Sequence, residues 1–185
     1  ITESWLEEML QLCQQKDVGM VGAKLYYPDD TIQHAGVVVG LGGVAAHVLC
    51  KLPRDAEGYM GRLRCVQEIS AVTAACMMVK TSVFKAVGGF DEELKVAFND
   101  IDLCMKVRKY GVKIVFTPYA ELYHYESKSR GMEDTPEKQL RFSREVNCFR
   151  RKWERELLKG DPYYNPNLTL NNTDCSLRKQ EKNGD

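Results

Sequence analysis

The 185-residue sequence has no excess of charge of either sign, because Lys and Arg together number 26 and so do Asp and Glu. A nucleic-acid-binding protein needs a basic patch, so this balance argues against nucleic acid as a partner. The sequence also lacks an apolar run long enough to span a bilayer, and no signal-peptide pattern opens it. We therefore expect a cytoplasmic protein, and leave contact with the inner face of the membrane open.

Close cysteine pairs are also missing. None of the seven cysteines belongs to a C-x-x-C pair, which argues against a zinc site and favours reduced, mostly buried thiols. A G-x-S-x-G elbow is absent as well, so a serine hydrolase is not expected. The sequence begins with Ile1 rather than Met and leads directly into a helical pattern, so we expect an excised or processed piece of a longer protein.

Helical and extended patterns alternate along the chain, which predicts an α/β fold around one sheet. Ser4 and Glu7 form a capping-box pattern at the first helix, and small residues between 68 and 80 indicate either a packed central strand or the floor of a binding site. Proline is expected to stop a strand at Pro118. The remaining predicted helices cover 81–87, 99–110 and 136–159, and the strands cover 18–23, 31–39, 113–118 and 121–125.

The segment from Gly88 to Cys104 is the most informative in the chain. It reads as a turn followed by a helix whose first turn carries Asp100 and Asp102. A helix N-terminus stabilises negative charge, so an aspartate there stays ionised and can accept a proton from a hydroxyl if it faces a cleft. A capped surface helix with acidic first-turn residues explains the same spacing and is the commoner case.

Six segments, taken in order and spacing, resemble those of family 2 glycosyltransferases. They are residues 18–25 (VGMVGAKL), 32–36 (IQHAG), 71–79 (AVTAACMMV), 88–92 (GGFDE), 99–104 (NDIDLC) and 122–124 (LYH). This family comprises inverting enzymes of the GT-A fold, which transfer sugars from nucleotide diphosphates. The resemblance covers roughly residues 1 to 165, and it implies a GT-A-type mixed sheet flanked by helices.

One family motif has no counterpart here. In the family, a nucleotide-binding half precedes the first helix of this chain and ends in an Asp-x-Asp motif that holds Mg²⁺ or Mn²⁺. This sequence has no such motif before Ser4, and Asp100-Ile-Asp102 matches a later motif instead. The resemblance therefore implies an acceptor-side portion over residues 1–160, without the nucleotide-binding half and inactive alone. We expect 161–185 to be a polar, partly disordered tail.

The resemblance also assigns roles around the acidic helix. Asp100 matches the base that deprotonates the acceptor hydroxyl, while Asn99 replaces a residue that is commonly acidic. Asp102 is expected to stabilise the helix rather than to catalyse. The substrate-binding residues implied are Ala71, Thr73, Ala74, Asp91 and Asn99. Strand packing explains the first three equally well, and turn formation explains Asp91.

A second group is implied to hold the leaving diphosphate. His124 matches a ligand of the metal or of a phosphate oxygen, and a partly buried histidine bonded to backbone is the alternative. Ser127, Lys128 and Arg130 would bind the diphosphate directly, unless they form a solvated charge cluster. Two further histidines, His34 and His47, are taken as structural.

The predicted partners are a nucleotide-diphosphate sugar and a glycan or lipid-linked acceptor, in the synthesis of surface polysaccharide. Arginines opposite the apolar stripe of the long helix suit anionic lipid, although a solvated face is the default. They are Arg141, Arg144, Arg150, Arg151 and Arg155. The competing hypothesis is a glycan-binding or scaffold domain that has lost catalysis.

Overall fold

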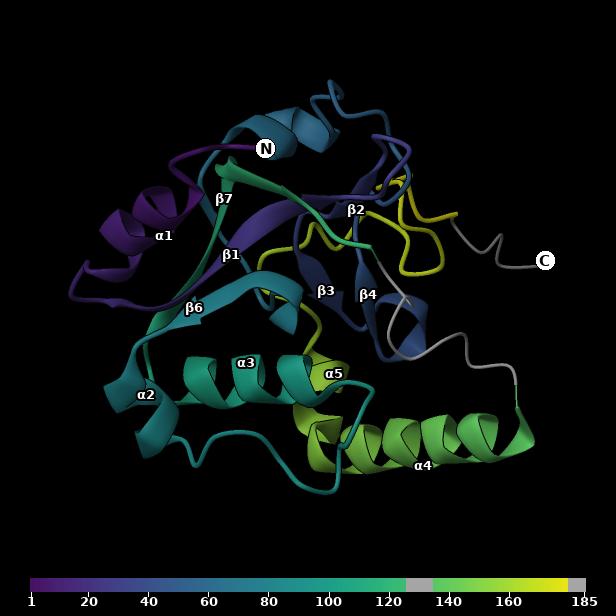
Figure 1. Ribbon diagram of the computed structural model, residues 1–185. Helices are drawn as coiled ribbons and strands as arrows, with labels where there is room; N and C mark the ends of the chain where they lie inside the picture. Colours follow the sequence, from purple (N-terminus) through teal and green to yellow (C-terminus); the bar gives the residue numbers. More distant parts are fainter. Residues whose placement is uncertain (126–134, 180–185) are drawn as a thin grey trace.

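A computed structural model describes residues 1–125 and 135–179 (Figure 1). Its centre is a five-stranded mixed sheet in which β1 (Val18–Tyr26) runs parallel to β7 (Lys113–Tyr123). Three short strands pair antiparallel with these two: β2 (Ile32–His34) and β6 (Met77–Val79) with β1, and β5 (Gln67–Glu68) with β7. A separate hairpin joins β3 (Val37–Val39) to β4 (Ala45–His47).

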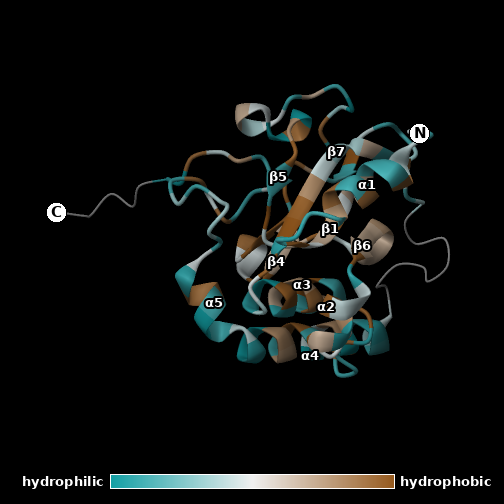
Figure 2. Ribbon diagram, turned by 90° about the vertical axis from the view of Figure 1, so that its left-hand side faces the viewer, coloured by the Kyte–Doolittle hydropathy of each residue, from teal (hydrophilic) through white to brown (hydrophobic). Residues whose placement is uncertain are grey.

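Helices cover both faces of the sheet. The helix α1 (Trp5–Cys13) lies on one side, while α2 (Thr81–Ala86) and α3 (Asn99–Lys109) lie on the other (Figure 1). Every residue of β1 is buried, as expected for a central strand covered on both faces. Beyond α3 lie α4 (Pro136–Lys152) and α5 (Glu154–Lys159), on which polar residues are frequent (Figure 2). No described helix is both long and apolar enough to cross a membrane.

Two predicted strands are shorter than expected. The segment 31–39 divides into β2 and β3, which belong to different sheets, because Gly36 turns the chain at a φ of 106°. In the segment 68–80, only Glu68 and the three residues of β6 are in strands, and residues Ala74–Cys76 form a 3₁₀ turn. The capping box at α1 is also wrong, since the Ser4 side chain makes no capping hydrogen bond.

The predicted break at Pro118 is wrong, because β7 continues through it. The partners of Ala23 and Lys24 on β7 are Thr117 and Glu121, so three residues bulge out between them. Pro118 lies in this bulge, where its missing N–H removes no hydrogen bond from the ladder.

The long helix predicted over 136–159 is also wrong, because it breaks at Trp153. This residue leaves the helical conformation at a φ of −114° and a ψ of 23°, and it separates α4 from α5. Among the predicted lipid-facing arginines, Arg150 donates to the carbonyl oxygen of Gly43 at 3.1 Å and Arg141 lies 3.7 Å from Glu145. Those two side chains therefore contact the protein itself.

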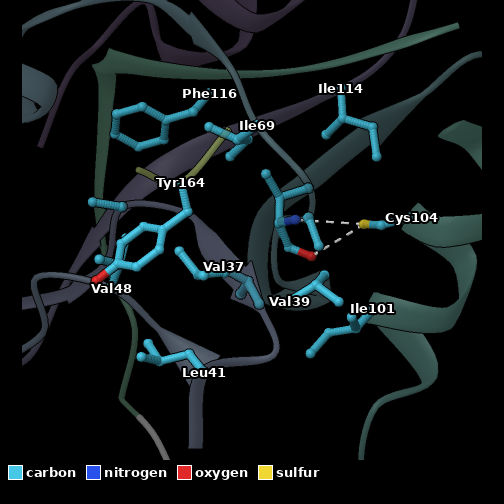
Figure 3. Close-up of a cluster of buried hydrophobic side chains, with 14 of the residues drawn as sticks. Val37, Val39, Leu41, Val48, Ile69, Ile101, Cys104, Ile114, Phe116 and Tyr164 are labelled. Carbon is cyan, nitrogen blue, oxygen red and sulfur yellow. Dashed lines mark hydrogen bonds between the residues drawn. The ribbon is translucent and has the colours of Figure 1, made fainter. Parts of the chain in front are cut away.

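The predicted polar tail is folded over residues 161–179. Its backbone bonds to the β3–β4 region, where the N–H of Leu49 donates to the carbonyl oxygen of Thr173 at 2.6 Å. Tyr164, Leu168 and Cys175 are buried in the larger hydrophobic core, in which Figure 3 shows Tyr164 among side chains of β3 and α3. The tail is thus part of the domain.

Candidate functional site

The start of α3 places Asp100 beside the 3₁₀ turn Ala74–Cys76. Asp100 is half-buried, and its Oδ2 atom accepts a hydrogen bond of 3.0 Å from the N–H of Ala74. Its Oδ1 atom accepts from the N–H of Ile101 at 2.9 Å. The carboxylate therefore lies at a helix start among backbone donors, which is favourable for a negative charge.

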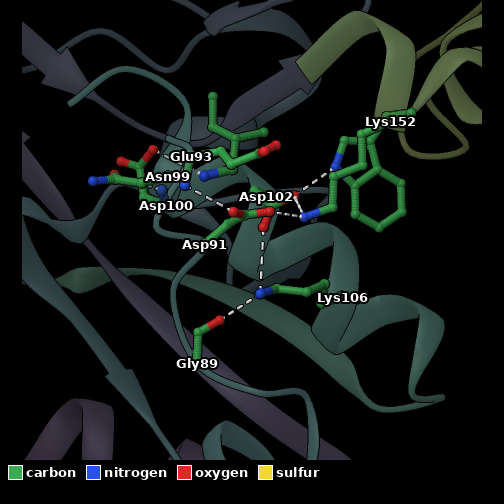
Figure 4. Close-up of polar contacts among 10 residues, drawn as sticks. Gly89, Asp91, Glu93, Asn99, Asp100, Asp102, Lys106 and Lys152 are labelled. Atoms are coloured by element: carbon green, nitrogen blue, oxygen red, sulfur yellow. Dashed lines mark hydrogen bonds and ion pairs between the residues drawn. The ribbon is translucent and has the colours of Figure 1, made fainter. Parts of the chain in front are cut away.

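Asp102 has different surroundings, although it belongs to the same helical turn. It is fully buried, and its Oδ1 atom accepts from the indole Nε1 of Trp153 and from Nζ of Lys152, each at 2.8 Å. Its Oδ2 atom lies 3.4 Å from Nζ of Lys106 (Figure 4). This carboxylate joins α3 to α4 and α5, and no ligand reaches it in this arrangement.

Two other predicted contact residues are engaged locally. Asp91 forms an ion pair with Lys152, and its Oδ1 atom accepts from the N–H of Glu93 at 3.0 Å. The hydrogen bond from Lys152 holds the pKa of Asp91 below its ordinary value. Asn99 accepts from the N–H of Asp100 at 2.7 Å through its Oδ1 atom. Both side chains lie near the start of α3, as Figure 4 shows.

The predicted small-residue floor divides into a buried and an accessible part. Ala71 is fully buried and its carbonyl oxygen accepts from the N–H of Val37, so its side chain packs inside the protein and its contact with substrate stays a prediction. Thr73 is half-buried and caps the turn through Oγ1, which accepts from the N–H of Ala75 at 3.3 Å. Ala74 is exposed and holds Asp100.

A pair of histidines lies behind Thr73. The Nε2 atom of His34 accepts from the N–H of Thr73 at 3.4 Å, so a neutral His34 ring carries its proton on Nδ1. That atom lies 3.0 Å from Nδ1 of His47, which then accepts the bond. Complete burial, and secondly the neighbouring His47, hold the pKa of His34 well below its ordinary value, so the ring is neutral at pH 7.

His124 lies at the end of β7, next to β2. Its Nδ1 atom is 2.7 Å from Oε1 of Gln33, and Nε2 of Gln33 donates to the carbonyl oxygen of His124 at 3.2 Å. Since the amide oxygen can only accept, Nδ1 carries the proton and Nε2 has the lone pair. This tautomer suits a metal ligand or an acceptor.

A cavity of about 270 Å³ brings several of these side chains together. It is lined by Tyr27, Gln33, Ala46, His47, Cys50, Thr73, His124 and Thr173. None of these is an Asp, Glu, Lys or Arg, so its polar groups are hydroxyl, amide, imidazole and thiol. Asp100 does not line the cavity, but it accepts a hydrogen bond from Ala74, which follows the lining residue Thr73.

Sequence reasoning gave a site role to two of these lining residues, Thr73 and His124. Gln33 lies in a segment used for the family resemblance, but no role was assigned to it. His47 was taken as structural. Thr173 belongs to the segment predicted as a tail. The remaining predicted residues, Ser127, Lys128 and Arg130, lie outside the described residues.

The described residues offer no ready cluster of metal ligands. Within residues 1–125 and 135–179, no group of three or more His, Cys, Asp or Glu side chains could hold a metal ion. Magnesium and manganese prefer carboxylate and phosphate oxygens, and His124 alone is a poor match for them.

Comparison with known proteins identifies the family. A family model described as "Glycosyltransferase like family 2" matches residues 1–145. The chain belongs to this family. The mixed sheet flanked by helices is that of a partial GT-A domain, and the expected fold class is confirmed.

Three curated relatives are similar to this family 2 domain. The uncharacterized protein y4gI of Sinorhizobium fredii is 58% identical over 96% of the chain and 20% of its own length. The O-antigen biosynthesis protein RfbC of Myxococcus xanthus is 39% identical over the whole chain and 14% of its own length. A Mycobacterium tuberculosis N-acetylglucosaminyl-diphospho-decaprenol L-rhamnosyltransferase is 36% identical over 34% of the chain and 20% of its own length. The chain thus spans a fifth or less of these relatives.

Proposed function

We propose that this chain is the acceptor-side portion of an inverting glycosyltransferase, in which Asp100 is the catalytic base. The observation that carries the proposal is the position of Asp100, half-buried at the start of α3 and bonded to the backbone of the turn that follows Thr73. Each oxygen of this carboxylate accepts one backbone hydrogen bond among the described residues, so each keeps a lone pair for the proton of an incoming hydroxyl.

The reaction balances with one base. The acceptor hydroxyl gives its proton to the Asp100 carboxylate while its oxygen forms a bond to the anomeric carbon. The bond from that carbon to the diphosphate breaks, and its electron pair leaves with the nucleoside diphosphate. A positioned base of this kind contributes roughly 10²–10⁴-fold in rate. Thr73, Ala74 and Asn99 would contact the substrates beside it.

The sugar that best fits the cavity is a neutral hexose or deoxyhexose. Among the described residues, the lining offers hydroxyl, amide and imidazole groups, which satisfy sugar hydroxyls, and no cation that would pair with a uronic acid. The similarity to an L-rhamnosyltransferase supports a neutral deoxyhexose, and the similarity to the O-antigen biosynthesis protein RfbC supports a polysaccharide or lipid-linked acceptor.

His124 is proposed to contact the diphosphate. Its Nδ1 atom is held by Gln33, so Nε2 is the ring atom left to contact the diphosphate. Ser127, Lys128 and Arg130 follow in sequence and supply hydroxyls and cations suited to the same group. A Mg²⁺ or Mn²⁺ ion, when the complete enzyme binds one, would neutralise the leaving diphosphate.

The test uses the whole protein that contains this chain, because the donor half lies elsewhere. Release of nucleoside diphosphate is measured with donors that carry hexoses, deoxyhexoses or uronic acids. Asp100→Asn should lower turnover by about 10²–10⁴-fold while donor binding persists. Asp55→Asn, at an exposed aspartate, is the matched control and should leave turnover unchanged. Full activity of Asp100→Asn would rule out Asp100 as the base.

The second candidate is a glycan-binding or scaffold domain without catalysis, which Asn99 favours because the family commonly has an acid there. The same assay separates the two. If the unaltered whole protein turns over no donor but retains glycan binding, the second candidate replaces the first.

A further inference from the structure

The junction that leads into α3 is held in a strained conformation. Phe98, directly before the helix, has a φ of 62° and a ψ of 6°, which a residue with a bulky side chain rarely adopts. Such a conformation persists only where its surroundings fix it. Its ring lies 5.8 Å from that of Phe142 and 5.4 Å from that of Phe149, both on α4.

Glu145 of α4 holds the two residues before Phe98. Its Oε1 atom accepts from the N–H of Val96 and its Oε2 atom from the N–H of Ala97, each at 3.0 Å. The side chain is 4% exposed, and the Arg141 Nε atom lies 3.7 Å from Oε2. A buried carboxylate bonded to two backbone donors fixes both the place and the direction of that loop.

Helix α4 also contacts the chain on the C-terminal side of Asp100, within α3. Lys152, at the end of α4, binds the buried Asp102, as does the following Trp153. The chain is therefore held by α4 and its end at residues 96–97 and again at residue 102. Asp100 lies between these two attachments, and within residues 1–125 and 135–179 its carboxylate accepts hydrogen bonds from the backbone N–H groups of Ala74 and Ile101.

We propose that Glu145 is a positioning residue: by holding residues 96 and 97, it sets where α3 begins and so where the Asp100 carboxylate meets Ala74. The proposal rests on Asp100 being the base, as put forward above. In this proposal, α4 orients the base as well as packing against the core.

The test is nuclear magnetic resonance on the ¹⁵N,¹³C-labelled 185-residue chain, unaltered or carrying Glu145→Gln. The glutamine has the same shape but only one acceptor oxygen. Amide exchange at Val96 and Ala97 should quicken by about tenfold or more, as expected on losing hydrogen bonds to a charged acceptor. The Asp100 side-chain ¹³C and Ala74 amide resonances should shift with it. Glu154→Gln, at an exposed glutamate of α5, is the matched control and should change none of these.

Faster exchange at Val96 and Ala97 with unmoved Asp100 and Ala74 resonances would show a merely structural glutamate and overturn the proposal. Unchanged exchange would overturn it as well. If the glutamine variant does not fold, Glu145→Asp is measured by the same criteria, since it keeps the charge. These resonances report where Asp100 lies rather than whether it takes a proton, so they remain interpretable if Asp100→Asn proves active.

Discussion

Asp100 and Asp102 lie two residues apart at the start of α3 and meet opposite surroundings. Two residues correspond to roughly 200° around a helix, so one carboxylate faces the turn Ala74–Cys76 and the other faces α4 and α5. In the part of the chain that the structure describes, Asp100 accepts from backbone N–H groups, whereas Asp102 is enclosed by Lys106, Lys152 and the Trp153 indole. The two aspartates therefore have different roles: Asp100 is the proposed proton acceptor, while Asp102 joins α3 to α4.

Two cavities extend the comparison to the two ends of α3. The larger, about 640 Å³, lies at the helix C-terminus and has charged lining residues such as Lys109, Arg108 and Glu68. Several of its polar groups are already paired, since Arg108 donates to Ser70 and Tyr163 donates to Glu68. The smaller cavity lies near the helix start, where Asp100 is. Cavity size therefore does not select the candidate site, and the chemistry of the lining does.

Replacing each aspartate by asparagine tests most directly whether Asp100 and Asp102 have different roles. Asp100→Asn should lower turnover by 10²–10⁴-fold, equivalent to about 3–5 kcal/mol in the barrier, at a cost to folding of under about 1 kcal/mol. Asp102→Asn should instead lower the free energy of unfolding by about 3 kcal/mol, because it removes the buried charge that Lys106 and Lys152 share and leaves Lys152 with Asp91 as its remaining counter-charge. Urea unfolding of both variants checks the folding effects. Equal losses of stability would contradict the distinction.

The buried His34 gives a smaller effect that depends on pH. The unfolded chain takes up a proton near pH 6.5, whereas the folded chain does so only well below that. Stability should therefore fall as the pH drops below 6.5, by about 1.4 kcal/mol per unit, or about 2 kcal/mol at pH 5. Urea midpoints between pH 7.5 and 5 measure this slope. His34→Gln should flatten it, and an unchanged slope would assign the pH dependence to other groups.

Local patterns predicted the elements that carry their own signals. The start of α3 at Asn99 and the existence of α2 followed from caps, apolar spacing and glycines, and the structure confirms them. The break at Trp153 did not follow from them, and the indole there bonds to Asp102, 51 positions away in the chain. Periodicity within a helix carries no information on such a partner.

The candidate site was predictable in part for the same reason. Asp100 and His124 were found because each lies in a motif, although their roles remain proposals. The pairing of Gln33 with His124 joins residues 91 positions apart, and Thr173 enters the cavity from a segment whose polar composition concealed its packing. Pattern reasoning finds residues on one element, whereas a cavity is made by several.

The smallest effect is expected on removing the indole hydrogen bond from Trp153 to Asp102. Trp153→Phe keeps most of the ring's packing but removes the N–H that donates to Oδ1 at 2.8 Å, so the free energy of unfolding should fall by about 1.5 kcal/mol. Trp5→Phe, at a half-buried tryptophan of α1, is the matched control for the loss of ring area. Urea unfolding compares the two. If both variants lose the same stability, the indole bond adds nothing, and Asp102 is held by its two lysines alone.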